Sequence, residues 1–313
     1  MDNFFNLGFI RTLESLRFPL LDRIMSAITL CGGQYVFIAL AMVILWCFDK
    51  KRGYFLLIAG FIGTVFCQFL KIYMKIPRPW VKDPGFTVVK SAKGGATGYS
   101  FPSGHAQNAV STYGGLAVSS RRKRSKILFP ILALLICFTR LYLGCHTLMD
   151  VIVGGGIAAA LLFVLWPILR TVNEHPGRMY PIIAVCLTLV CGFLAYLKIK
   201  PAPDDKNYLE ALKNAYTLFG AFAAFLVLYP LQVRFVPFKE QAPLLGQILK
   251  VVLGFGLVMG VKFGLTPLLN HLFGKVLWPR MIVYFVMVML AGLVWPMTFG
   301  LWQRVGKKKE NEE

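Results

Sequence analysis

The sequence predicts an all-α protein, a polytopic transmembrane helical bundle of about nine spans with an amphipathic segment before the first span. Two observations predict this fold class. Of the 313 residues, 57% are apolar and 15% are Asp, Glu, Lys or Arg, against roughly 45–50% and about 25% in soluble proteins. The apolar residues also gather in long runs, and a helical span needs about 20 of them. These features exclude a soluble globular fold.

Residues 1–30 form the first predicted part of the chain, an amphipathic segment with a helix over residues 4–29. Apolar residues such as Phe9 and Leu13 recur at helical spacing, and charged residues such as Arg11 fill the gaps. This pattern is typical of a helix that lies in the membrane interface. Because the charges interrupt the apolar core that a cleaved signal peptide needs, we expect the segment to remain in the mature protein.

Nine apolar runs follow, and each is predicted to span the membrane. Their ranges are 34–48, 54–71, 104–119, 127–143, 150–169, 179–197, 209–230, 244–265 and 278–300. The first five belong to a predicted core over residues 31–170, which carries all the motifs that indicate chemistry. The last four belong to residues 171–313, which end in a short basic and acidic tail. In the fifth span, the run Gly154–Gly156 is predicted to permit close helix packing.

Charge and cysteine content narrow the possible partners. The formal net charge of +20 is compatible with nucleic acid, an anionic membrane surface or a phosphorylated substrate. Membrane embedding argues against nucleic acid. The seven cysteines contain no CxxC pair, and most of them fall in apolar runs, where cysteine behaves as a small hydrophobe. Neither a disulfide framework nor a zinc site is expected.

Local charge density predicts the orientation in the membrane, since the total Lys and Arg counts on the two sides nearly tie. Basic residues crowd the short connection 121–126 and follow the last span at Lys307–Lys309. Such clusters favour the cytoplasmic side. The loop 77–103 and the corner 143–146 then lie on the opposite side of the membrane. We expect an integral protein of a bacterial cell membrane with these two connections on the extracytoplasmic face.

Ionisable residues gather in three clusters at span ends. An ionisable group near hydrocarbon is unfavourable in free energy, so each is expected to have a function or a partner. The first cluster covers residues 71–79, in which two prolines end the helix and present an arginine at a fixed angle. The second, residues 101–105, opens the third span with Phe-Pro-Ser-Gly-His. The third, residues 139–150, joins the fourth span to the fifth.

Two of these clusters have the spacing of a phosphoryl transfer site. A helix that starts at Ser103 offers backbone N–H groups at the positive end of its dipole, and Gly104 leaves room for an anion. His146 and Asp150 are four residues apart, so the carboxylate can orient one imidazole nitrogen and leave the other as a nucleophile.

Cations and a second histidine complete the predicted site. Arg140, Arg78 and Lys71 supply positive charge for several phosphate oxygens, with the guanidinium groups able to bind in bidentate fashion. His105 remains as a proton donor. These are the parts of a metal-free site for phosphoryl transfer.

The motifs, in this order and with these spacings, resemble the type 2 phosphatidic acid phosphatase superfamily. They are Lys71-(six)-Arg78-Pro79, Pro102-Ser103-Gly104-His105 and Thr139-Arg140-(five)-His146-(three)-Asp150. The one departure is Thr139, where the family usually has Ser, and it retains a hydroxyl. The resemblance implies that His146 forms a phosphohistidine intermediate, Asp150 orients it and His105 protonates the leaving group. It further implies phosphate binding, with no metal and no cofactor, by Lys71, Arg78, Ser103, Gly104 and Arg140.

The layout of nine spans with an outer N-terminus resembles the glucose-6-phosphatase and sphingosine-phosphate phosphatase branches more than the six-span bacterial lipid phosphatases. Fold does not fix the substrate. We expect an enzyme, a lipid phosphatase, that hydrolyses a phosphate monoester or diphosphate at the extracytoplasmic membrane face. Phosphatidic acid, phosphatidylglycerophosphate, undecaprenyl diphosphate and sphingoid-base phosphate all remain candidates, and the oligomeric state is open.

Three alternative functions compete with this hypothesis. They are a lipid phosphotransferase, a phosphatase for soluble sugar phosphates, and a non-catalytic transporter of phosphorylated lipid. A transporter needs cations, but it has no reason to place His-x-x-x-Asp opposite a second histidine. The histidines therefore favour an enzyme.

Overall fold

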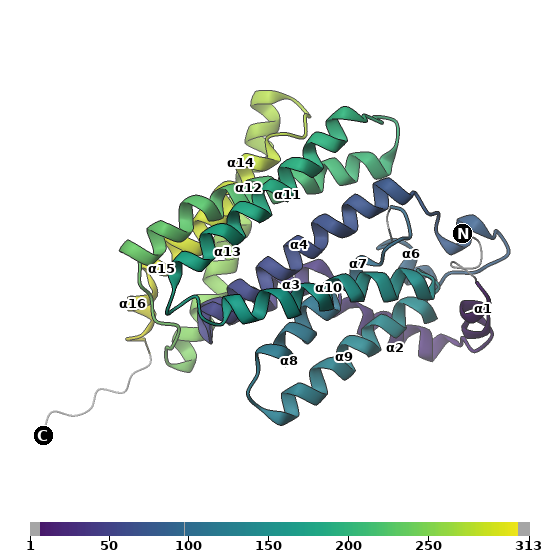
Figure 1. Ribbon diagram of the computed structural model, residues 1–313, viewed down its shortest axis with the longest axis horizontal. Coiled ribbons are helices and arrows are strands. Elements are labelled where there is room, and N and C mark those ends of the chain that lie inside the picture. Colours follow the sequence, from purple (N-terminus) through teal and green to yellow (C-terminus); the bar gives the residue numbers. More distant parts are fainter. Residues whose placement is uncertain (1–6, 97, 306–313) are drawn as a thin grey trace, which may run out of the picture. The chain divides into compact units, whose positions relative to one another are not determined.

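The computed structural model describes residues 7–96 and 98–305, and this part of the chain is helical, with no strand. Residues 4–6 of the expected N-terminal helix and the tail from residue 306 lie outside the described residues. Figure 1 labels the elements. They are α1 (Gly8–Ser15), α2 (Pro19–Leu30), α3 (Gln34–Cys47), α4 (Lys50–Met74), α5 (Pro79–Lys82), α6 (Lys90–Lys93), α7 (Gly104–Ala109), η1 (Val110–Gly114), α8 (Gly115–Ser119), α9 (Lys123–Tyr142), α10 (Leu148–Leu169), η2 (Pro176–Arg178), α11 (Met179–Ile199), α12 (Lys206–Phe235), α13 (Leu244–Phe273), α14 (Arg280–Met289), η3 (Leu290–Val294), α15 (Trp295–Met297) and α16 (Phe299–Trp302).

Every predicted span coincides with helix, but the count of nine is not confirmed. Among the described residues, seven helices are long and apolar enough to cross a membrane, or eight if α2 and α3, which are bent by 45°, count as one span. On its own α3 has 14 residues, which is short of the roughly 20 that a span needs. The run 104–119 is divided by the π-helical segment η1.

The chain forms two compact units. The first comprises Met1–Ala41, Tyr54–Arg170 and Ile199–Ala211, and the second comprises Met42–Gly53, Thr171–Lys198 and Leu212–Glu313. All residues predicted for the functional site lie in the first unit. The division into residues 1–30, 31–170 and 171–313 stays a prediction.

Close helix contact in the first unit depends on a glycine of α10. The helix α7 packs against α9 and α10. A Cβ atom added at Gly154 would lie 2.4 Å from the carbonyl oxygen of Ser103, whereas a Cβ at Gly156 would meet nothing within 4 Å. The predicted packing role is therefore confirmed at Gly154, which lets the start of α7 approach α10.

The variant Gly154→Ala should be less stable than the wild type by about 1–3 kcal/mol, the usual cost of overpacking, because Ser103 and α10 must move apart. Gly156→Ala is the matched control in the same helix, and its Cβ has open space. The measurement is the thermal unfolding of both variants in detergent. Equal melting temperatures for the two variants would contradict the packing role.

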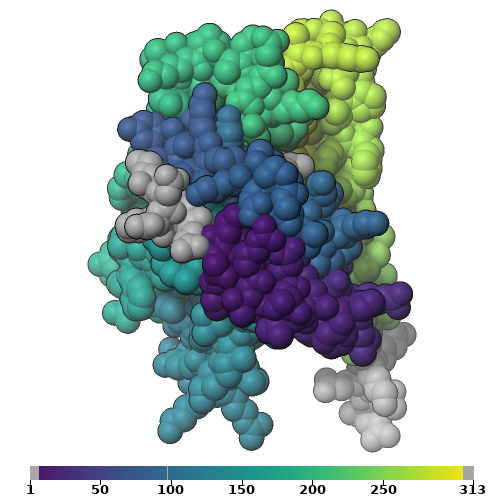
Figure 2. Space-filling view, turned by 90° about the vertical axis from the view of Figure 1, so that its right-hand side faces the viewer, coloured from purple at the N-terminus to yellow at the C-terminus, as the bar shows by residue number. Residues whose placement is uncertain are grey.

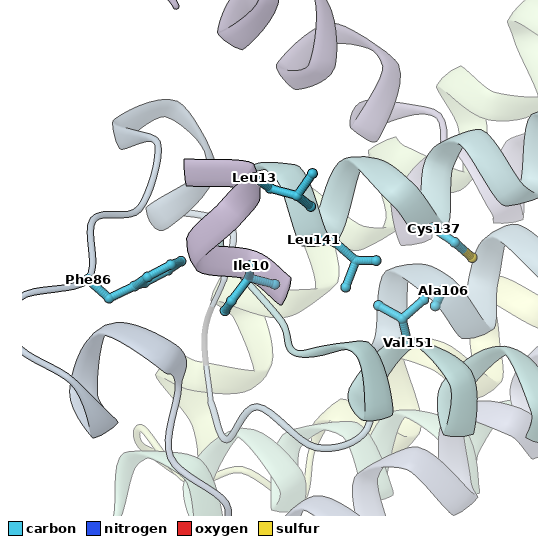
Figure 3. Packing of buried hydrophobic residues seen from close by; sticks show 7 residues of the cluster. All are labelled: Ile10, Leu13, Phe86, Ala106, Cys137, Leu141 and Val151. Atoms are coloured by element: carbon cyan, nitrogen blue, oxygen red, sulfur yellow. The ribbon is translucent and has the colours of Figure 1, made fainter. Parts of the chain in front are cut away.

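The N-terminal segment is two helices, and the first packs into the protein core. Ile10 and Leu13 of α1 are buried in a cluster with Phe86, Leu141 and neighbouring apolar residues (Figure 3). The burial of apolar surface stabilises this contact by about 25 cal/mol per Å². Ile10 and Leu13 thus contact protein, whereas Phe9 is exposed. The expected single interfacial helix over residues 4–29 is not confirmed.

The second unit holds a lysine inside an apolar helix. Lys250 of α13 is buried, and its Nζ donates a hydrogen bond to the carbonyl oxygen of Glu240 at 2.7 Å. Its ammonium group also lies 4.5 Å from the centre of the Phe299 ring. A carbonyl and an aromatic face are suitable partners for a buried cation, so Lys250 has a structural explanation.

Candidate active site

The first cluster is positioned by the end of α4 and by two prolines. Lys71 lies in the last turn of α4, where its Nζ donates to the carbonyl oxygen of Tyr99 at 2.7 Å. Arg78 is extended, with φ −66° and ψ 154°, and immediately precedes α5. A residue before proline favours this conformation, and Pro79 begins the short helix. The chain therefore turns sharply between the two cations.

Arg78 joins the first cluster to the third. The side chain is 6% exposed, and its Nε donates to the carbonyl oxygen of Gly98 at 3.0 Å. Its Nη1 donates to the carbonyl oxygen of Cys145 at 2.9 Å and lies 2.9 Å from Nε2 of His146. Because guanidinium groups only donate hydrogen bonds, this contact places a lone pair on Nε2 and the proton of the neutral imidazole on Nδ1.

The other side of the imidazole faces a fully buried carboxylate. Nδ1 of His146 lies 3.5 Å from Oδ2 of Asp150. The same Oδ2 accepts hydrogen bonds from the hydroxyl of Ser100 at 2.6 Å and from the backbone N–H of Thr147 at 2.7 Å. Thr147 and Asp150 form a capping box at the start of α10, which satisfies free N–H groups of that helix. The cap therefore fixes the carboxylate beside His146.

Ser100 is a contact residue that the sequence does not reveal. It lies in a loop rich in Pro, Gly, Ser and Lys, outside the three motifs, and no spacing distinguishes it from Ser91. Its position comes from the backbone, since its N–H donates to the carbonyl oxygen of Ile76 at 2.8 Å. That bond ties the loop to the segment between Lys71 and Arg78.

The second cluster begins a helix as predicted. Ser103 is the N-cap of α7, and its hydroxyl accepts a hydrogen bond from the backbone N–H of Ala106. The N–H of Ser103 donates to the carbonyl oxygen of Asp150 at 2.8 Å. The N–H groups of Gly104 and His105 remain at the helix start, where no intrahelical partner exists. A Cβ added at Gly104 would meet nothing within 4 Å, so the space over this glycine is open to an anion.

Arg140 comes from the last turn of α9 and is 2% exposed. Its Nη1 donates to the hydroxyl of Thr29 in α2 at 2.8 Å, and its buried Nε has no hydrogen-bond partner among the described residues. Thr29 is a second contact residue that sequence analysis missed.

Burial and three neighbouring cations favour the neutral form of His146. This residue lies between α9 and α10, outside the helices that could cross a membrane. Burial, and after it the charges of Arg78, Arg140 and Lys71, lower the pKa of His146 well below its usual value. The imidazole is therefore neutral and can act as a nucleophile at neutral pH. The same three cations also act electrostatically on His105, which is partly buried.

The structure thus brings together the predicted site residues in the first unit. Direct contacts join Arg78, His146 and Asp150 and link the backbone of Ser103 to Asp150, and electrostatic interaction joins His105, Lys71 and Arg140 to them. Within residues 7–96 and 98–305, no group of three or more His, Cys, Asp or Glu side chains could hold a metal ion.

Helices long and apolar enough to cross a membrane, together with a centre of cations, two histidines and a carboxylate, define a class of protein. Residues 52–174, which contain all three motifs, match the model of the PAP2 superfamily. The resemblance indicated by the three motifs is confirmed. No solved structure matches the chain.

The chain is similar to several curated lipid phosphatases. It is 31% identical to sphingosine-1-phosphate phosphatase 2 from Homo sapiens over 171 residues, which cover 53% of this chain and 42% of that protein. It is 27% identical to phosphatidylglycerophosphatase B from Bacillus subtilis (strain 168), over 48% of this chain and 76% of that protein. It is 28% identical to an undecaprenyl-diphosphatase from Sulfolobus acidocaldarius, over 51% of this chain and 76% of that protein. The chain spans about half the length of the sphingosine-1-phosphate phosphatases it matches.

Proposed function

We propose that this protein is an integral membrane phosphatase that hydrolyses a phosphate monoester or diphosphate of a lipid through a phosphohistidine intermediate, without a metal. The observation that carries the proposal is the way His146 is held. Arg78 contacts its Nε2, and the Asp150 carboxylate faces its Nδ1. A phosphate group that binds Arg78 therefore lies next to a nitrogen that carries a lone pair.

In the first step, a phosphate oxygen replaces Nε2 of His146 as the acceptor of the hydrogen bond from Arg78, and the freed lone pair of Nε2 attacks phosphorus. The bond between phosphorus and the leaving oxygen breaks, and its electron pair stays on that oxygen, which takes a proton from His105. Asp150 stabilises the positive charge that develops on the imidazole. The negative phosphate offsets the surrounding cations, and this allows His105 to hold its proton before the reaction.

In the second step, water cleaves the phosphohistidine. His105, now neutral, takes a proton from the water, whose oxygen bonds to phosphorus. The electron pair of the phosphorus–nitrogen bond returns to Nε2 of His146. Lys71, Arg78 and Arg140, together with backbone N–H groups at Gly104, stabilise the charge on the phosphate oxygens in both steps.

A lipid substrate is supported by the relatives and by the helices. The names of three relatives specify sphingosine 1-phosphate, phosphatidylglycerophosphate and undecaprenyl diphosphate, and each is a phosphorylated lipid. Most of the site residues lie at or next to the ends of helices long and apolar enough to cross a membrane, and Ser103, Gly104 and His105 open the short helix α7. A lipid can present its headgroup there while its chains stay among apolar side chains.

The experiment that tests this function is phosphate release by purified protein in detergent with EDTA. The panel contains the three lipids named above, phosphatidic acid and glucose 6-phosphate. We expect release from at least one lipid at a higher kcat/KM than from the sugar phosphate. A transporter would release no phosphate from any of them, and a transferase would require an added acceptor alcohol. Loss of all activity with EDTA would contradict a metal-free reaction.

The site is further proposed to face the extracytoplasmic side, in a protein with nine spans. The support is the density of exposed basic residues in the connection that contains Lys123. Single cysteines at Lys93 and Lys123, which are both exposed, should then react differently with a membrane-impermeant maleimide. The first should be labelled in intact cells and the second only after permeabilisation.

The labelling experiment requires a background without native cysteines, because Cys31 and Cys191 are exposed. Labelling of the Lys123→Cys protein in intact cells, with protection of the Lys93→Cys protein, would reverse the proposed orientation. The enzyme would then act on lipids of the cytoplasmic leaflet, with the same chemistry.

A further inference from the structure

The N-terminal helices α1 and α2 lie outside residues 52–174, the part that matches the PAP2 superfamily, yet they contact the candidate site. Figure 2 shows them, in purple, beside the blue segment that follows α4. Side-chain bonds hold this arrangement. Arg11 pairs with Asp83, and Glu14 accepts a hydrogen bond from the backbone N–H of Thr87 at 2.7 Å.

The same helices also hold the end of α9, next to the corner that carries His146. Nε of Arg17 donates to the carbonyl oxygen of Tyr142 at 2.8 Å. The hydroxyl of Tyr142 in turn donates to Asp22 at 2.9 Å. Beyond the end of α2, a Cβ added at Gly32 would lie 2.5 Å from the side chain of Ile136 and 3.4 Å from the carbonyl oxygen of His105. The end of α2 therefore lies against both α9 and α7.

Thr29 is the polar residue of α2 that reaches into this centre. It is 6% exposed, and its hydroxyl accepts the hydrogen bond from Nη1 of Arg140. Nε of Arg140 has no partner among the described residues although it is buried. The hydroxyl thus fixes one corner of the guanidinium group and leaves the edge that contains Nε for another acceptor. An arginine edge made of Nε and one Nη can bind a phosphate in bidentate fashion.

We propose that Thr29 is a positioning residue that holds the guanidinium group of Arg140 in the orientation that binds the phosphate of the substrate. The proposal rests on the phosphatase function proposed above, and it extends the site to a helix outside the matched domain. Thr29 does not touch the phosphate. It acts by restricting the rotamers of Arg140, so that this side chain loses less conformational entropy when the phosphate binds.

The test compares Thr29→Val, which keeps the shape and removes the hydroxyl, with Thr29→Ser, which keeps the hydroxyl. We expect the Thr29→Val substitution to lower kcat/KM about tenfold and to raise the inhibition constant of vanadate by a similar factor, since a hydrogen bond to a charged group is lost. Ser should stay close to wild type. Thr12→Val is the matched control, because Thr12 is exposed and its hydroxyl donates to the carbonyl oxygen of Gly8 in its own helix, away from Arg140.

A double-mutant cycle separates positioning from a merely structural role. If Thr29 acts through Arg140, the Val substitution should have little further effect in an Arg140→Lys protein. Three results would each overturn the proposal. They are a full tenfold loss of kcat/KM from Thr29→Val in the Arg140→Lys protein, equal losses of kcat/KM in Thr29→Val and Thr29→Ser, and an unchanged vanadate inhibition constant in Thr29→Val. If Thr29→Val does not fold, Thr29→Ala is measured against the same controls.

The two proposals fail differently. If the wild type releases no phosphate from any substrate, the phosphatase function fails. Thr29 is then tested by vanadate alone, through the shift in unfolding temperature that vanadate causes in the wild type, Thr29→Val and Thr29→Ser. A smaller shift in the Val protein than in the Ser protein supports the positioning of Arg140, and equal shifts overturn it.

Discussion

Phosphate release by the His146→Ala protein is expected to fall by about 10³-fold or more, because the nitrogen that attacks phosphorus is gone. The cations that bind phosphate remain. Vanadate or inorganic phosphate should therefore still bind and still raise the unfolding temperature of the variant. The measurement is kcat in detergent with EDTA, with ligand-dependent stabilisation as evidence of an intact site.

His175→Ala is the matched control for this loss. His175 is exposed and precedes η2 in the second unit, and it should be replaceable without effect on kcat. A folded His146→Ala protein that turns over at a near-normal rate would rule out His146 as the nucleophile. The phosphohistidine mechanism would fail with it.

Removal of His105 should have the second-largest effect, and the size of the effect should depend on the leaving group. With a lipid alkoxide as leaving group, His105→Ala should lower kcat by about 10²–10⁴-fold, the usual contribution of a general acid. With p-nitrophenyl phosphate the first step should change little, because p-nitrophenolate leaves without a proton. The second step should still be slow, since His105 also activates the water.

A burst of p-nitrophenolate followed by a slow steady rate is therefore the expected time course for His105→Ala. Rapid mixing with optical detection measures both phases. If the variant loses the same factor with both substrates and shows no burst, His105 is not the acid in the first step.

Sequence analysis could predict those site residues that contact a residue nearby in the sequence or that belong to a family motif. His146 and Asp150 are four residues apart, His146 just before α10 and Asp150 in its first turn, and the structure places the carboxylate beside Nδ1. Ser103 begins α7 as expected. Their catalytic and binding roles stay predictions.

The contacts that sequence analysis missed join residues far apart in the chain. Thr29 and Arg140 are separated by 111 positions, and no periodicity links them. Arg11 filled a gap in an amphipathic pattern, so the pattern indicated contact with water. In the structure Arg11 pairs with Asp83 of a loop distant in sequence. A hydropathy pattern does not predict such an ion pair.

The number of spans was the weakest prediction for a similar reason. Apolar composition locates the helices well, as the agreement between the run 54–71 and α4 shows. It does not reveal where a backbone changes its hydrogen-bond register, as η1 does within residues 104–119. It also does not reveal that α2 and α3 together form a bent pair.

The most direct test of the proposed mechanism is to trap the phosphorylated enzyme. His105→Ala is mixed with p-nitrophenyl phosphate and quenched in alkali, in which phosphohistidine is stable, and the modified residue is located by mass spectrometry. Phosphate is expected on His146, formed at the rate of the p-nitrophenolate burst and absent from the His105→Ala/His146→Ala double variant. Release of p-nitrophenolate with no phosphate on His146, or with phosphate on another residue, would contradict the proposed mechanism.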